Sequence, residues 1–174
     1  MTEVGIILGS ESDKKIGEKC VETLEKLGIK YKITVASAHR TPERVKSIVK
    51  EYEKKGVKVF IGIAGLSAAL PGVIASLTTK PVVGVPTDAS LWGLDALLSM
   101  SQMPPGIPVA AVGVNNGKNA ALLAAEIIGL SDKKIEKKIK NYRNEMRLST
   151  ESSAKMLENN ARSCHFNKHR TKSK

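Results

Sequence analysis

Short apolar runs alternate with amphipathic segments along most of this 174-residue chain. The apolar runs are rich in Ile, Val and Ala and predict five strands, at residues 4–8, 31–35, 59–64, 81–85 and 109–114. Apolar positions three and four residues apart predict helices at residues 13–27, 42–55, 68–78, 91–101 and 118–130. Because strands and helices alternate, we expect a parallel sheet with helices on both faces.

Glycine, proline and capping residues mark where the predicted helices begin and end. Gly28 closes the apolar stripe of the first helix, as glycine commonly does just after a last helical turn. Pro42 suits the first turn of the second helix, and Thr41 can cap it. Residues 103–108 contain three prolines and a glycine and predict an irregular loop.

The end of the chain has a different pattern. Asp132 is expected to cap a final basic helix that reaches at least to Met146, and the pattern fades from about Ser149. We expect residues 162–174 to be loosely held. The prediction is one α/β domain at residues 1–131 and a basic C-terminal helix and tail at residues 132–174. The fold class is a flavodoxin-like three-layer α/β/α sandwich with a parallel five-stranded sheet and an extra C-terminal helix.

The net charge of +11 is unevenly distributed. Residues 1–131 have 15 Lys and Arg against 12 Asp and Glu, whereas residues 132–174 have 13 against 5. The excess therefore belongs to the last helix and tail, away from the loops that contain the candidate chemistry. This distribution favours a solvated end or an assembly arm, and we expect no nucleic-acid partner.

Composition narrows the class of protein further. Aromatic residues make up only 3% of the chain, so Ile, Val, Leu and Ala must build the core. No stretch has the length and apolar character of a membrane span, and the first three residues leave no room for a signal peptide. Cys20 and Cys164 are isolated, which fits neither a disulfide framework nor a metal site. We expect a cytoplasmic protein without a membrane partner.

The run Ser37-Ala38-His39-Arg40-Thr41-Pro42 follows the second predicted strand. Open α/β sheets bind ligands at the carboxyl ends of their strands. His39 is the only histidine in the first 164 residues, and a neutral imidazole can carry a proton near pH 7. Arg40 can form a forked contact with a phosphate. A lone histidine is commonly structural, and here its neighbours favour a chemical role.

The run Gly9-Ser10-Glu11-Ser12-Asp13 follows the first predicted strand. A glycine and two hydroxyls at the start of a helix favour an anion such as phosphate, because the helix dipole and free N–H groups point there. The alternative is that Ser12 or Asp13 merely caps the helix. The run is neither a Walker loop nor a dinucleotide fingerprint, so neither ATP nor a dinucleotide is indicated.

Small residues follow the third predicted strand, from Gly65 to Gly72. They can let a flat ring approach the backbone, or they can serve tight helix–sheet packing. The loop after the fourth strand contains Trp92, which could be a lid or a subunit contact.

Phosphate donors, a carboxylate for sugar hydroxyls and one proton carrier together indicate a ribonucleotide-sized ligand, acid/base chemistry and no metal cluster. The candidate residues are His39 for catalysis and, for substrate binding, Ser10, Ser12, Asp13, Ser37, Arg40, Gly65, Ser67 and Leu70.

Six motifs resemble the PurE family over residues 4 to about 130. They are GSESD at residues 9–13, SAHRTP at 37–42, LPG at 70–72, GLDALLS at 93–99, QMPPGIPVA at 102–110 and NAALLAA at 119–125. The family comprises N5-carboxyaminoimidazole ribonucleotide mutases of purine biosynthesis and relatives that carboxylate aminoimidazole ribonucleotide directly. The resemblance implies a cofactor-free rearrangement with CO2 as intermediate. His39 falls on the general acid/base, and Ser10, Asp13 and Arg40 fall on substrate-binding positions.

Ala69 departs from the family pattern, because the mutases usually have a histidine directly before Leu-Pro-Gly. The direct carboxylases also lack that histidine, but they typically have lysine after the active histidine and usually lack an intact Leu-Pro-Gly. Since Arg40 and Leu70-Pro71-Gly72 are mutase-like, we favour the mutase and keep the direct carboxylase as the alternative. A non-catalytic nucleotide-binding module, whose basic tail docks a partner, is the alternative from another class.

Assembly is the last expectation. Residues 119–130 are rich in Ala and Leu around most of a helix, and residues 93–103 are similarly apolar. We expect these surfaces to be buried between subunits. The resemblance implies a homo-octamer with sites near subunit boundaries.

Overall fold

The computed structural model describes residues 2–170 of the chain, and the side chains of residues 2–159. The chain divides into two units, Met1–Glu136 and Lys137–Lys174. The first unit contains the whole sheet. Within the described part of the chain, no helix combines the length and apolar character needed to cross a lipid bilayer.

Five parallel strands form one sheet in the order β2-β1-β3-β4-β5. This is the flavodoxin-like strand order, so the predicted fold class is confirmed. The central strands are continuous apolar runs that are buried on both faces, as the sequence pattern predicts. The strands are β1 (Val4–Leu8), β2 (Tyr31–Val35), β3 (Val59–Ala64), β4 (Val82–Pro86) and β5 (Ala110–Ala111).

The last strand is where the prediction is wrong. Six residues were expected in it, and only Ala110 and Ala111 pair with β4. Beyond them the chain still follows β4 loosely, since the N–H of Val112 donates to Gly84 O and that of Asn115 to Pro86 O. β5 is an edge strand with one neighbour, so an apolar run there does not need a regular ladder.

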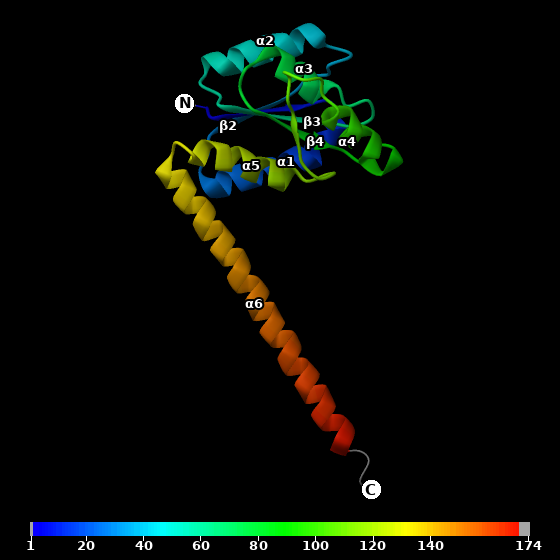
Figure 1. Ribbon diagram of the computed structural model, residues 1–174, viewed down its shortest axis with the longest axis vertical. Helices are drawn as coiled ribbons and strands as arrows, with labels where there is room; N and C mark the ends of the chain where they lie inside the picture. The colour runs from blue at the N-terminus through cyan, green and yellow to red at the C-terminus, as the bar shows by residue number, and fades with distance from the viewer. Residues whose placement is uncertain (1, 171–174) are drawn as a thin grey trace. The chain divides into compact units, whose positions relative to one another are not determined.

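Helices cover both faces of the sheet (Figure 1). The α2 and α3 helices lie on one face, and α1 and α5 lie side by side on the other. Short 3-10 turns at Glu11–Asp13 and Leu91–Gly93 precede α1 and α4. The helices of this unit are α1 (Lys14–Leu27), α2 (Pro42–Lys54), α3 (Leu70–Leu77), α4 (Leu94–Ser101) and α5 (Gly117–Gly129).

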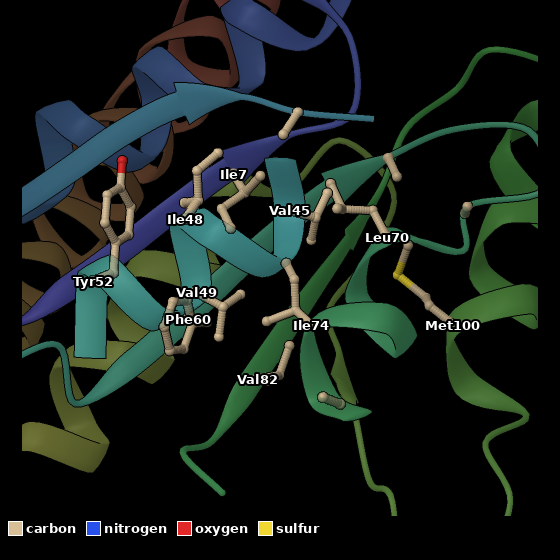
Figure 2. Close-up of a cluster of buried hydrophobic side chains, with 14 of the residues drawn as sticks. Ile7, Val45, Ile48, Val49, Tyr52, Phe60, Leu70, Ile74, Val82 and Met100 are labelled. Carbon is tan, nitrogen blue, oxygen red and sulfur yellow. The ribbon is translucent and has the colours of Figure 1, made fainter. Parts of the chain in front are cut away.

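A buried aliphatic cluster joins the sheet to α2, α3 and α4 (Figure 2). Phe60 and Tyr52 are its only aromatic members, in keeping with the low aromatic content. Leu70 at the start of α3 and Met100 on α4 belong to the same cluster. The core therefore holds α3 and α4, which both follow strands at the carboxyl edge of the sheet.

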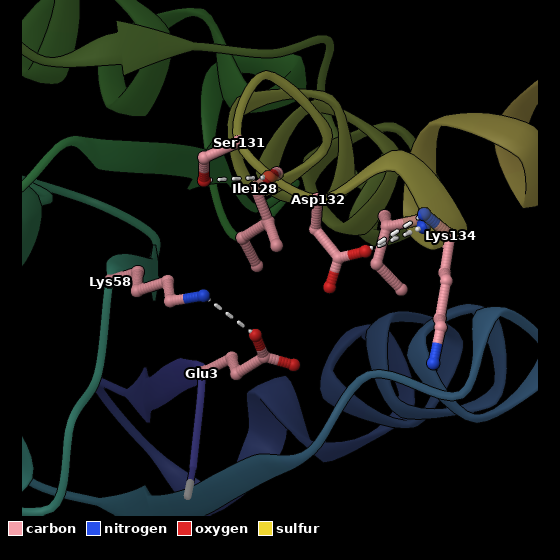
Figure 3. A network of polar contacts seen from close by, with 7 residues as sticks. Glu3, Lys58, Ile128, Ser131, Asp132 and Lys134 are labelled. Carbon is pink, nitrogen blue, oxygen red and sulfur yellow. Dashed lines mark hydrogen bonds and ion pairs between the residues drawn. The ribbon is translucent and has the colours of Figure 1, made fainter.

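Capping residues act partly as predicted. Gly28 ends α1 in the left-handed conformation with φ 66°. Asp132 caps the last helix, because its Oδ1 accepts hydrogen bonds from the N–H groups of Lys134 at 2.9 Å and Ile135 at 3.3 Å (Figure 3). The prediction for Thr41 is wrong. It occupies the cap position of α2, but its hydroxyl exchanges hydrogen bonds with the backbone of Ser37.

The last helix, α6, runs from Lys133 to Arg170. It extends far beyond Ser149, where the pattern was expected to fade. Residues 131–174 contain neither glycine nor proline, and Arg147 pairs with Glu151 one turn away at 2.5 Å. Helix propensity therefore continues after the apolar periodicity has weakened. The predicted loose segment, residues 162–174, is helical as far as Arg170, and the side chains of Cys164, His165 and His169 lie outside the described residues.

Candidate functional site

A cavity of about 490 Å³ opens at the carboxyl ends of β1 to β4. It is lined by the loops that follow these four strands. All nine residues proposed from the sequence line it, namely Ser10, Ser12, Asp13, Ser37, His39, Arg40, Gly65, Ser67 and Leu70. The fold therefore brings together residues that are up to 60 positions apart in the chain.

The loop after β1 places a carboxylate inside this cavity. Asp13 is only 6% exposed, and its Oδ2 accepts a hydrogen bond from the N–H of Ser10 at 3.0 Å. Burial raises the pKa of Asp13, while hydrogen bonds from the Ser10 N–H and the hydroxyls of Thr87 and Ser12 oppose that rise. Asp13 does not cap α1 with its side chain. Its carboxylate instead organises the turn that begins at Ser10.

The loop after β2 is a turn closed by its own hydrogen bonds. The N–H of Thr41 donates to Ser37 O at 2.9 Å, and the N–H of Arg40 donates to Ser37 Oγ at 3.2 Å. The Arg40 side chain then reaches across to the first loop, where its Nη2 donates to Gly9 O at 3.4 Å. The guanidinium therefore lies between the two loops and retains donors that can face the cavity.

His39 lies at the exposed part of the same turn and lines the cavity. Among the described residues, none forms a hydrogen bond or ion pair with its imidazole. Both ring nitrogens can therefore exchange protons with a bound molecule.

The loop after β3 approaches the loop after β4 closely. A Cβ on Gly65 would overlap Thr87 Oγ1 and would lie 2.8 Å from the Cβ of Ala89. Tight packing is therefore the reason for glycine at this position. Ala69, the residue that departs from the mutase pattern, lines the cavity directly before α3.

Thr87 is the lining residue with a polar side chain that the sequence reasoning missed. It is 5% exposed, and its hydroxyl lies against Gly65 and contributes to the surroundings of Asp13. Its position directly after the fourth strand was the available signal, because the other site residues follow strands in the same way. Trp92, by contrast, does not line the cavity and is 88% exposed.

No cluster of three or more His, Cys, Asp or Glu side chains suited to a metal ion occurs among the described residues. The polar groups that line the cavity are hydroxyls, one buried carboxylate, one guanidinium and one imidazole. Such a set can bind an anion and sugar hydroxyls and can move a proton.

Comparison with known proteins identifies the family. The family model described as AIR carboxylase matches residues 3–149, a segment that contains every residue of the cavity. The chain belongs to the AIR carboxylase family. The resemblance expected from the six motifs is thereby confirmed.

Two relatives named as mutases are similar to the chain over most of their own length. The N5-carboxyaminoimidazole ribonucleotide mutase of Methanocaldococcus jannaschii is 61% identical over 142 residues, which is 82% of this chain and 88% of that protein. The mutase of the same name from Pyrococcus horikoshii is 50% identical over 156 residues, 89% of this chain and 88% of that protein. The crystal structure of Treponema denticola PurE is 37% identical with a TM-score of 0.75, covering 93% of this chain and 98% of that chain.

Proposed function

We propose that this AIR carboxylase family member is an N5-carboxyaminoimidazole ribonucleotide mutase of de novo purine biosynthesis. The product is 4-carboxy-5-aminoimidazole ribonucleotide. The observation that carries the proposal is the cavity at the carboxyl ends of β1 to β4, which gathers the His39 imidazole with anion-binding and sugar-binding groups. The high identity to relatives named as mutases supports it.

The ribonucleotide binds through its phosphate and ribose. The 5′-phosphate lies against the Arg40 guanidinium, the Ser10 hydroxyl and the N–H groups at the helix start after β1. Asp13 accepts hydrogen bonds from the ribose hydroxyls, and its burial supports this role because few waters compete for the carboxylate. The imidazole ring is left near His39 and the small residues that follow Gly65.

His39 manages the protons of the carboxyl transfer. The bond between the exocyclic nitrogen and the carbamate carbon breaks, CO2 departs, and the nitrogen takes a proton from the imidazolium of His39. The ring carbon then attacks CO2 and forms the new carbon–carbon bond. The neutral imidazole removes the proton from that ring carbon, which restores the starting state. One histidine can serve both steps because the proton it takes from the ring carbon replaces the one it gave to the exocyclic nitrogen.

Confinement of CO2 is the second requirement of this chemistry. Free CO2 in an open cleft would diffuse away before the ring carbon attacked it, so the bound ring and the loops must enclose it. The apolar lining from Leu66, Ala68 and Leu70 supports this confinement, because it offers no groups that would hydrate the gas.

We also propose that the protein assembles as a homo-octamer. The 3-10 turn and α4 expose four large apolar side chains, those of Leu91, Trp92, Leu94 and Leu98. An isolated chain would leave this patch in water. The apolar side chains of α5 give less support than the sequence suggested, since within one chain they are buried or half-buried.

The working compartment in this proposal is a reducing cytoplasm. Cys20 is a free, buried thiol that donates a hydrogen bond to Gly117 O at 3.0 Å. Burial raises its pKa to about 12, so the thiolate needed for oxidation is scarce. Such a thiol is a packing group between α1 and α5, which fits the reducing compartment proposed here.

One assay distinguishes mutase from direct carboxylase. Purified protein is supplied either with N5-carboxyaminoimidazole ribonucleotide or with aminoimidazole ribonucleotide plus bicarbonate, and the ring-carboxylated product is measured. A mutase converts N5-carboxyaminoimidazole ribonucleotide at low bicarbonate. Preferential use of aminoimidazole ribonucleotide plus bicarbonate would favour the carboxylase, the alternative that Ala69 keeps open.

A companion exchange experiment tests for catalysis as such. Labelled bicarbonate is incubated with the protein and the ring-carboxylated nucleotide, and label in the nucleotide is followed. A catalyst exchanges the carboxyl group. Nucleotide binding without exchange or turnover would contradict the proposed function and favour a binding module.

A further inference from the structure

The cavity loop, defined here as residues 65–68, has a strained backbone. Leu66 has φ 56° and Ala68 has φ 36°, although neither is glycine. Residues with a Cβ avoid this left-handed region, and such conformations persist only where surrounding contacts hold them. The loop lines the cavity along its whole length. Its contacts therefore decide the shape of the cavity wall.

Packing holds the two ends of the cavity loop. Gly65 lies against Thr87, and Ala68 is 3% exposed within the core cluster. The middle is different, because the side chains of Leu66 and Ser67 are exposed. Packing alone does not fix this part of the loop.

One side chain from another element holds the middle of the cavity loop. The hydroxyl of Ser99, on α4, donates a hydrogen bond to Ser67 O. Among the described residues, this is the one hydrogen bond that a helix donates to residues 65–68. The N–H of Ala68 donates to Gly65 O at 3.0 Å, so the peptide between Ser67 and Ala68 is held at both its carbonyl and its N–H.

The helix α4, which contains Ser99, is anchored in the hydrophobic core. Met100, the neighbour of Ser99, is fully buried and belongs to the same core cluster as Leu70, the first residue of α3 (Figure 2). Ser101, on the same helix, shows the usual arrangement, since its hydroxyl donates to Leu97 O of its own helix at 2.6 Å. The Ser99 hydroxyl instead bonds to a carbonyl 32 residues away.

We propose that Ser99 is a positioning residue for the carboxyl transfer. It touches neither the ring nor CO2 and acts through the backbone of Ser67. Its hydrogen bond keeps the strained loop in the conformation that encloses CO2 between loss from nitrogen and addition to carbon. The proposal rests on the proposed mutase function. Without the bond the loop relaxes and CO2 escapes. The nucleotide, with its exocyclic nitrogen protonated, then leaves the site as aminoimidazole ribonucleotide.

The test compares Ser99→Ala with the matched control Ser101→Ala and with Ser99→Thr, which keeps the hydroxyl. For Ser99→Ala we expect kcat to fall about 5- to 10-fold, the scale of one lost neutral hydrogen bond. KM should change less than about twofold, because the phosphate and ribose groups are intact. The fraction of substrate released as aminoimidazole ribonucleotide, corrected for the reaction without enzyme, should rise. Ser99→Thr should recover most of kcat, and Ser101→Ala should resemble wild type.

Amide hydrogen exchange without substrate provides a second readout that does not depend on activity. The Ala68 amide should exchange faster in Ser99→Ala than in wild type or Ser101→Ala. Unchanged exchange, or faster exchange with unchanged kcat and product partition, would overturn the role of Ser99. Wild-type protein without mutase turnover would overturn the proposed function and the role of Ser99 with it, while the exchange result would still report whether the contact exists.

Discussion

His39 is the residue on which the proposed chemistry depends most directly. Its imidazole lines the cavity, and no described side chain competes for it. We expect His39→Asn to lower kcat by at least ~10²-fold, the usual scale for loss of a general acid/base, because asparagine cannot carry the proton. Substrate should still bind, since the phosphate and ribose contacts come from other residues. Steady-state kinetics with calorimetric binding measures both effects, and near-normal turnover would remove His39 from the mechanism.

Arg40 is the residue that should distinguish a nucleotide from its nucleoside. Its guanidinium lies between the first two loops, within reach of a phosphate at the helix start. Arg40→Ala should weaken nucleotide binding by roughly 1.5–3 kcal/mol, typical of a charge-assisted hydrogen bond. Binding of the unphosphorylated nucleoside should change little. Titration calorimetry with both ligands tests this, and equal losses for the two would contradict the phosphate assignment.

Single residues were predictable where their chemistry is visible in the sequence. His39, Arg40 and Asp13 are conspicuous by type and by their position after a strand, and the fold gathers them as expected. Ser99, inside a helix, was not predictable in this way, and for Thr87 the position after a strand was the only signal. Their roles depend on tertiary contacts, with Gly65 for Thr87 and with the Ser67 carbonyl for Ser99.

At the scale of elements, close packing of the loops after β3 and β4 fixes one wall of the cavity. A Cβ on Gly65 would overlap Thr87 and approach Ala89. Gly65→Ala should therefore lower the free energy of unfolding by about 1–3 kcal/mol, as overpacking does. Gly113→Ala is the matched control, because nothing lies closer than 3.9 Å to its new Cβ. Denaturant unfolding of both variants measures the difference, and equal midpoints would mean that the loops can separate without loss of stability.

Elements were predictable to the extent that burial imposed a pattern. The β1 and β3 strands begin and end where their apolar runs do, because central strands are constrained over their whole length. At the edges the outcome differs: β2 pairs with β1 over all five residues, whereas the pairing of β5 ends after two, which an edge position allows but does not require. The α6 helix is longer than expected because helix propensity, without glycine or proline, outlasts the apolar pattern.

At the scale of the whole molecule, the excess positive charge and the exposed apolar patch belong to different parts of the chain. The body of the chain is nearly balanced in charge, and the excess of basic residues follows Ser131. Four of the eight exposed large apolar side chains of the first unit, in contrast, gather at the 3-10 turn before α4 and on α4 itself. This patch contains Trp92, which is the only tryptophan of the chain. Assembly through it would bury the fluorophore.

Light scattering and the fluorescence of Trp92 together test the predicted octamer. Light scattering at moderate salt should give a mass near eight times the 18.7 kDa of one chain. In the assembled protein the Trp92 emission should be blue-shifted relative to free tryptophan, although the side chain is 88% exposed in one chain, because the neighbouring subunit excludes water. A mass near one chain would contradict the octamer. A mass near eight chains with the emission of a solvated indole would retain the octamer and show that it forms through a face other than the Trp92 patch.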